Sequence, residues 1–141
     1  MEISEVRQRV LLTIDRAKRG AAERRQQSDE ASREYDVFLD RIAVPLFRQV
    51  ANALKVENYH FTVFTPGGSV RLMSDRSPED FIELTLDTAG ERPIVTGHCS
   101  RARGRRVLES ERAINEGPVR ELTEDDVLRF LLQELEPFVD R

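Results

Sequence analysis

Residues 59–72 read YHFTVFTPGGSVRL and carry the clearest evidence for β-structure in the chain. Every second residue from Tyr59 to Val63 is apolar, which is the period of a half-buried β-strand. The Pro-Gly-Gly run at 66–68 supplies turn residues, and the alternation resumes at Val70. The pattern predicts a β-hairpin, because two alternating runs joined by a short turn pair as antiparallel neighbours.

Three more segments downstream have strand character and are separated by short, turn-rich connections. They are 81–87, with isoleucine and leucine on one face, 94–101, and 105–112. Short connections favour antiparallel neighbours, since a parallel crossover needs about a dozen residues or more. Residues 58–114 are therefore predicted to form a five-stranded antiparallel meander.

Upstream of the hairpin, the apolar period lengthens to that of a helix. Residues 1–44 contain no proline and a single glycine, Gly20, and helix-favouring residues dominate. We predict a long amphipathic helix or coiled-coil arm here, kinked or broken near Pro45, and a second helical segment over 45–57. One set of positions has the alternating four-and-three spacing of a coiled-coil seam: Val10, Ile14, Ala17, Ala21, Arg24, Ser28, Ala31, Tyr35, Phe38 and Ile42.

The middle of this helix, residues 18–34, has only alanines as apolar residues. A segment of this polarity cannot pack on a domain core. Two arrangements leave this segment exposed to solvent. One is a rod of about 60 Å that overhangs the body, at about 1.5 Å per residue, and the other is a helical hairpin that turns near Gly20 or Ser28. The unbroken seam spacing favours the rod.

A closing helix is predicted over 122–136. Thr123 precedes three acidic residues, which suits a helix start because a hydroxyl caps free amides and acids favour the positive end of the helix dipole. Pro137 is expected to end the helix at Glu136, since proline has no amide hydrogen to donate. The chain 1–141 is thus predicted as a single α+β domain with this C-terminal helix packed on the sheet.

Composition bounds the class of protein. The chain carries a formal net charge of −4, and no apolar run approaches the ~18 residues needed to cross a bilayer. The acidic start, with Glu2 and Glu5, differs from the basic start of a secretory signal, and the single cysteine excludes an internal disulfide. We therefore expect a cytoplasmic protein without a membrane segment, and the acidic balance argues against a nucleic-acid partner.

Residues that can carry catalysis or hold a metal are few. His98 and Cys99 adjoin, but neighbouring residues of a strand point to opposite faces, so we interpret Cys99 as a small buried core residue. A metal site made from His60, His98 and Cys99 lacks the short ligand spacings that are typical of zinc sites. We predict no catalytic residue, no metal and no cofactor.

Acidic pairs and the glycine-rich turn also have structural interpretations. The acids at 79–80 and 124–126 precede predicted elements, and those at Glu134 and Glu136 lie on the predicted solvent side of the closing helix. The turn at 65–69 is too short for a phosphate-binding P-loop and has no lysine. An enzyme of unknown reaction type is therefore the weakest of three functional hypotheses.

Four arginines, Arg101, Arg103, Arg105 and Arg106, surround Gly104 in a predicted turn. Guanidinium groups bind phosphate and carboxylate with two hydrogen bonds, so this hairpin tip is a candidate for anion or nucleic-acid binding. The alternative is a solvated edge hairpin that charge protects against strand pairing. We favour the second interpretation, because no aromatic residue for base stacking lies between Arg101 and Glu111.

The seam is the candidate binding surface, and its residues are Val10, Ile14, Ala17, Tyr35 and Phe38. Its front half lies too far from the core-facing half to share the same intramolecular surface. The leading hypothesis is a non-catalytic protein–protein interaction domain, adaptor or chaperone-like, that is homodimeric through the N-terminal helix. The predicted layout of long helix, meander and closing helix is similar to that of small bacterial chaperone and adaptor domains.

Overall fold

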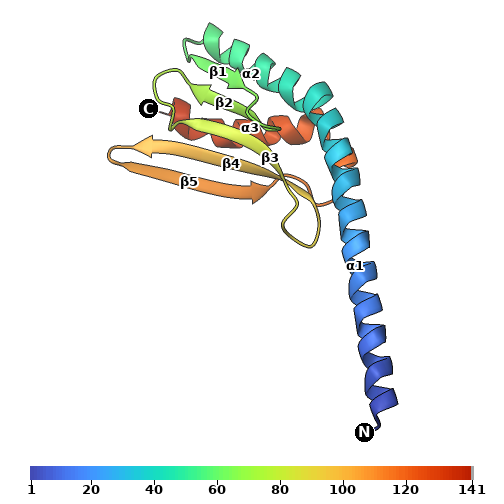
Figure 1. Cartoon of the computed structure of the whole chain (residues 1–141). Coiled ribbons are helices and arrows are strands. Elements are labelled where there is room, and N and C mark those ends of the chain that lie inside the picture. Colours follow the sequence, from blue (N-terminus) through green and yellow to red (C-terminus); the bar gives the residue numbers. More distant parts are fainter. Residues whose placement is uncertain (141) are drawn as a thin grey trace.

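The computed structural model describes residues 1–140 and has the predicted α+β architecture (Figure 1). Its elements in chain order are α1 (Ile3–Phe38), a π-helical turn (Leu39–Ala43), α2 (Val44–Val56), β1 (Phe61–Phe64), β2 (Val70–Ser74), β3 (Phe81–Asp87), β4 (Ile94–Arg103), β5 (Arg106–Ala113), a 3-10 turn (Val119–Glu121) and α3 (Glu124–Val139).

The five strands form one antiparallel sheet in the order β1-β2-β3-β4-β5, which is the predicted meander. Pairings such as Val70 with Leu84 and Ile82 with Cys99 place the apolar side chains on one face. Helices α2 and α3 pack on that face and enclose the core, while no helix of the described residues covers the opposite face (Figure 1). The prediction that the C-terminal helix packs on the sheet is confirmed.

Helix α1 is one continuous rod, and the hairpin alternative is wrong (Figure 1). Only its C-terminal part reaches the core, through Ala31, Tyr35 and Phe38. The polar segment before Ala31 extends away from the sheet, as expected for residues that have nothing apolar to bury.

The predicted break near Pro45 is confirmed as a change of helix type and direction (Figure 1). Proline lacks the amide that would bond to the carbonyl of Arg41, so the regular helical pattern stops one turn before it. A π-helical turn fills this gap, and the amide of Val44 donates to the carbonyl of Leu39. The chain then crosses the sheet as α2, which buries Phe47 completely.

Helix α3 starts as predicted and ends later than predicted. Thr123 caps it through a reciprocal pair of hydrogen bonds with Asp126. The expected stop at Glu136 is wrong, because the helix continues through Pro137 to Val139. Tertiary packing offsets the lost hydrogen bond: the ring of Phe138 is buried and meets Phe61 edge-to-face at a centroid distance of 6.1 Å.

Candidate functional site

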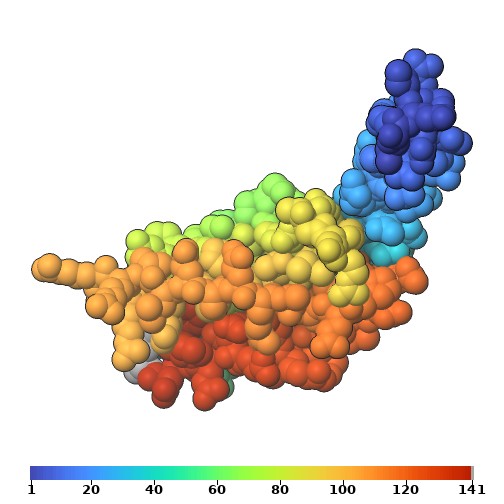
Figure 2. All heavy atoms as spheres, turned by 90° about the horizontal axis from the view of Figure 1, so that it is seen from below, coloured from blue at the N-terminus to red at the C-terminus, as the bar shows by residue number. Residues whose placement is uncertain are grey.

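The first half of α1 stands clear of the body, and every residue from 3 to 19 is exposed (Figure 2). We call residues 3–19 the arm. A helix turns about 100° per residue, so five apolar residues share one side of it. This arm stripe consists of Ile3, Val6, Val10, Ile14 and Ala17. The side chains of Val10 and Ile14 are 50% and 46% exposed, and together with Met1, Val6, Arg9 and Thr13 they line a shallow hollow of about 280 Å³.

The remaining surface of the arm is charged. Glu5 pairs with Arg9 at 3.0 Å and Asp15 pairs with Arg19 at 2.8 Å, both between successive turns. Glu5, Asp15 and Arg19 lie on the far side of the helix from the stripe, and Arg9 lies at its border. Leu12 also points away from the stripe and is 57% exposed, so it provides an apolar residue outside the candidate surface.

A second hollow lies at the base of the arm, where the β3–β4 loop approaches α1. In Figure 2 the yellow loop adjoins the blue helix at the point where the arm leaves the body. The hollow has a volume of about 360 Å³, and its helical wall includes Ala21, Arg24 and Ser28, which continue the line of the stripe. The apolar surface of the arm therefore leads directly into a polar recess, whose walls carry Arg24, Arg25 and Glu91.

Two of the five residues predicted to bind a partner belong to the core. The rings of Tyr35 and Phe38 are buried with their centroids 6.0 Å apart. The Tyr35 hydroxyl donates to the carbonyl of Leu84 at 3.2 Å, and burial raises the pKa of this phenol above its usual value. These residues anchor α1 to the sheet. Of the five residues predicted to bind a partner, Val10, Ile14 and Ala17 are exposed. Sequence reasoning missed Ile3, although it lies one heptad before Val10.

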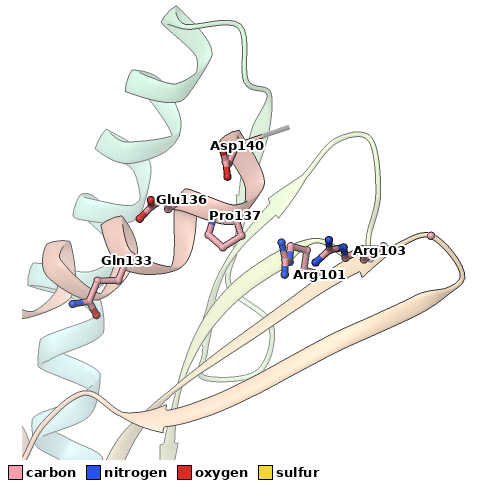
Figure 3. A pocket seen from close by; sticks show the side chains of 8 residues that line it. Arg101, Arg103, Gln133, Glu136, Pro137 and Asp140 are labelled. Carbon is pink, nitrogen blue, oxygen red and sulfur yellow. The ribbon is translucent and has the colours of Figure 1, made fainter.

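The arginine residues lie where predicted, at the tip of the β4–β5 hairpin, with Gly104 in the left-handed region at φ 63°. Arg101 and Arg103 line an open groove of about 610 Å³ between the hairpin and α3 (Figure 3). The opposite wall carries Glu136 and Asp140. An anion in this groove meets two carboxylates as well as two guanidinium groups, which weakens the case for phosphate binding.

Arg105 and Arg106 do not line the groove. The four arginines predicted to bind an anion are thus divided between two environments. Only Arg101 and Arg103 face a concave surface, and the hairpin tip bearing the other two extends away from the body (Figure 1).

The structure separates His98 from Cys99 in the way the strand pattern predicts. Cys99 is on the buried face of β4, where desolvation and then the nearby Glu134 raise the pKa of the thiol to about 12. The thiol is therefore protonated at neutral pH and is a poor nucleophile. The His98 ring is on the other face, edge-to-face with Phe81 at 5.3 Å and 3.7 Å from Glu109.

No group of three or more residues among the described part of the chain is arranged to hold a metal ion. His60 precedes β1 and contacts the side chain of Asn58 at 3.3 Å, far from the element that carries His98. The three residues considered for a metal site from the sequence are therefore not brought together.

Two acidic residues have different surroundings from those predicted. Asp80, predicted only as a charge that precedes a strand, is buried, and its carboxylate accepts a hydrogen bond from the amide of Ala102 at 2.7 Å. Glu134 is on the sheet side of α3 rather than its solvent side, and it pairs with Arg112 of β5 at 3.2 Å. Each carboxylate bonds a group from a distant strand, which local periodicity does not reveal.

The uncovered face of the sheet carries a polar network that the sequence analysis did not anticipate. The guanidinium of Arg71 lies 2.7 Å from the Glu83 carboxylate and 4.1 Å from the centroid of the Phe81 ring. Arg71 of β2 lies directly opposite Glu83 of β3, and Phe81 is two residues from Glu83 on the same face. The alternation of the two strands could therefore have indicated that these side chains lie together. The network satisfies the nearly buried Glu83, which makes it a structural element of this face.

Comparison with known proteins adds no assignment: no protein-family model matches the chain, and no curated protein or solved structure matches it. Among the described helices, none is long and apolar enough to span a membrane.

Proposed function

We propose that this chain is a non-catalytic protein–protein interaction domain, adaptor or chaperone-like, that forms a homodimer through α1. The observation that carries the proposal is the arm stripe, an apolar surface along residues 3–19 on which no other part of residues 1–140 packs.

The apolar face of the arm is unpacked in the single chain. The arm is about 26 Å long at about 1.5 Å per residue and continues α1 beyond the residues that pack on the sheet. Most helical stability in proteins comes from packing of an apolar face. A partner along the arm stripe supplies that packing, and the body of the same chain does not reach it.

The form of the surface also favours a helical partner. The stripe is narrow, and Val10, Ile14 and Ala17 have the four-and-three spacing, which suits another helix better than a sheet or a compact ligand. A second copy of this chain presents an identical apolar stripe. Two identical surfaces that pack on each other form a closed two-fold dimer.

Catalysis has less support. The thiol is buried and protonated, the two histidines lie apart, and the groove between the β4–β5 hairpin and α3 has walls of opposite charge. These features favour a binding role over a reaction at any of the predicted chemical groups.

Sedimentation velocity and light scattering test the proposal directly. We expect a mass near twice the 16.2 kDa of one chain at micromolar concentrations. A monomer that persists at high micromolar concentration, with the arm helical by circular dichroism, contradicts it.

A further inference from the structure

We propose that the groove between the β4–β5 hairpin and α3 binds a short peptide that has both of its termini free. The peptide carboxylate meets Arg101 and Arg103 on the hairpin wall, and its ammonium group meets Glu136 and Asp140 on the helical wall (Figure 3). The groove lies apart from the arm, so this inference is independent of the proposed dimerisation.

The charges of the two walls indicate the kind of ligand. The hairpin wall has two guanidinium groups and the helical wall has two carboxylates, so the groove as a whole is neutral. A simple anion is repelled by the carboxylates, and a simple cation is repelled by the guanidinium groups. A ligand that is negative at one end and positive at the other is attracted by both walls. A peptide with free termini has this form, because at neutral pH its carboxyl group is ionised and its amino group is mostly protonated.

The charged groups of the walls are available to a ligand. Within residues 1–140, none of the ion pairs joins the two walls or includes any of these four side chains. The guanidinium groups therefore keep their donors, and the carboxylates keep their acceptors. Arginine also binds a terminal carboxylate with two parallel hydrogen bonds, which favours this residue type for the carboxylate end.

The edge of β4 beside the groove adds an acceptor for a peptide amide. β3 begins at Phe81, which is paired with Ser100, so β4 has no strand partner on that side beyond Ser100. The amide of Ala102 donates instead to the Asp80 carboxylate at 2.7 Å. The N–H and C=O of one strand residue point to the same side, so the Ala102 carbonyl also lies on this side. Ala102 lines the groove, and no group within the described residues donates to its carbonyl.

The helical wall adds a donor for a peptide carbonyl. The side-chain oxygen of Gln133 accepts a hydrogen bond from the Arg112 guanidinium, which leaves the amide nitrogen of Gln133 free to donate. Gly104 and Pro137 complete the lining without adding charge. The volume of about 610 Å³ is within the range of small-ligand sites and accommodates a short peptide.

Titration of the full chain with trialanine, followed by calorimetry and two-dimensional NMR, tests the proposal. Trialanine has no charged side chain, and its N-acetyl and C-amide forms each lack one terminal charge. We expect saturable binding of trialanine, with shifts of the amide signals of groove residues. Each capped form should bind more weakly by about tenfold or more, because each cap removes a charge-assisted interaction.

Two double variants assign the ends of the peptide. Arg101→Gln with Arg103→Gln should weaken trialanine binding and remove the difference between trialanine and its C-amide form. Glu136→Gln with Asp140→Asn should remove the difference between trialanine and its N-acetyl form.

Arg105→Gln and Glu111→Gln are the matched controls. Each removes the same kind of charge from a residue of the hairpin that does not line the groove, and each should leave the affinity for trialanine unchanged.

Three results would overturn the proposal. The first is the absence of saturable trialanine binding up to about 10 mM, and the second is equal affinity for trialanine and its capped forms. The third is inorganic phosphate that binds as tightly as trialanine and is lost with the two arginines, which supports a simple anion site instead. None of these results bears on dimerisation through α1, which sedimentation measures separately.

Discussion

The substitution Val10→Ser tests how much the arm stripe contributes to association. Valine and serine have similar helix propensities, so the change alters the surface of the arm with little effect on its helicity. The side chain of Val10 is 50% exposed in the single chain, and pairing covers that half. Full burial of valine contributes about 1.5 kcal/mol, so the loss is about 0.8 kcal/mol per copy.

The serine hydroxyl adds a second cost. A buried hydroxyl costs about 1 kcal/mol at the low end, which applies here because it can donate to the backbone carbonyl one turn earlier. The sum is about 2 kcal/mol per copy and about 4 kcal/mol per dimer. At 1.4 kcal/mol per factor of ten, the dimer should weaken by about three orders of magnitude.

Sedimentation equilibrium over a concentration series measures this change in Kd. Leu12→Ser is the matched control, because Leu12 is exposed on the opposite side of the same helix and loses more helix propensity on substitution. We expect it to change Kd by less than about threefold. Equal weakening by the two variants, or an unchanged Kd for Val10→Ser, would refute the assignment of the stripe as the interface.

Three other predictions concern the body of the protein. Burial raises the pKa of the Cys99 thiol from 9.0 to about 12. The contribution of the protonated thiol to stability is therefore present below about pH 9 and is lost as the pH rises toward 12. In urea unfolding, the free energy of unfolding of the wild type should fall more steeply over this pH range than that of Cys99→Ala. Gly97→Ala should destabilise the fold by about 2 kcal/mol, because an added Cβ lies within 3.0 Å of the Phe130 ring. The double variant with Phe130→Leu should regain part of the lost stability, because the smaller side chain leaves space for the added Cβ. Replacing Arg103 and Arg105 together should leave dimerisation unchanged and reveal no loss of nucleic-acid binding, because we expect negligible binding at physiological salt.

Each of these three predictions is contradicted by a specific result. A native thiol that reacts as fast as a free cysteine at neutral pH contradicts the buried position of Cys99. An unfolding midpoint for Gly97→Ala equal to that of the wild type contradicts the close packing on Phe130. An affinity for duplex DNA that falls with salt at a log–log slope of about −4, and that disappears with the two arginines, supports the anion-binding alternative.

Local patterns in the sequence predicted the elements and their order. The alternation around Tyr59 and Val63, the short connections between strands and the cap at Thr123 each depend on residues close in the chain, so they are visible without a structure. The opposite facing of His98 and Cys99 also follows from strand geometry alone.

Helix α3 shows where such local reasoning fails. A proline predicts a helix end, but Pro137 lies inside α3 because Phe138 gains a contact with Phe61, a residue of the first strand. Phe130 is buried against Gly97, while Leu132 of the same helix is 57% exposed. The side of a helix that is buried depends on the shape of the sheet beneath it, which the helical period does not contain.

The candidate surface divides in the same way. The apolar seam along α1 is visible without a structure, because the spacing of Val10, Ile14 and Ala17 depends only on their order in the chain. Which part of that seam is exposed depends on how the helix packs on the sheet. The sheet covers Tyr35 and Phe38 and leaves the arm uncovered, because the change of direction at Pro45 brings α2 back over the strands and leaves the first turns of α1 beyond their edge.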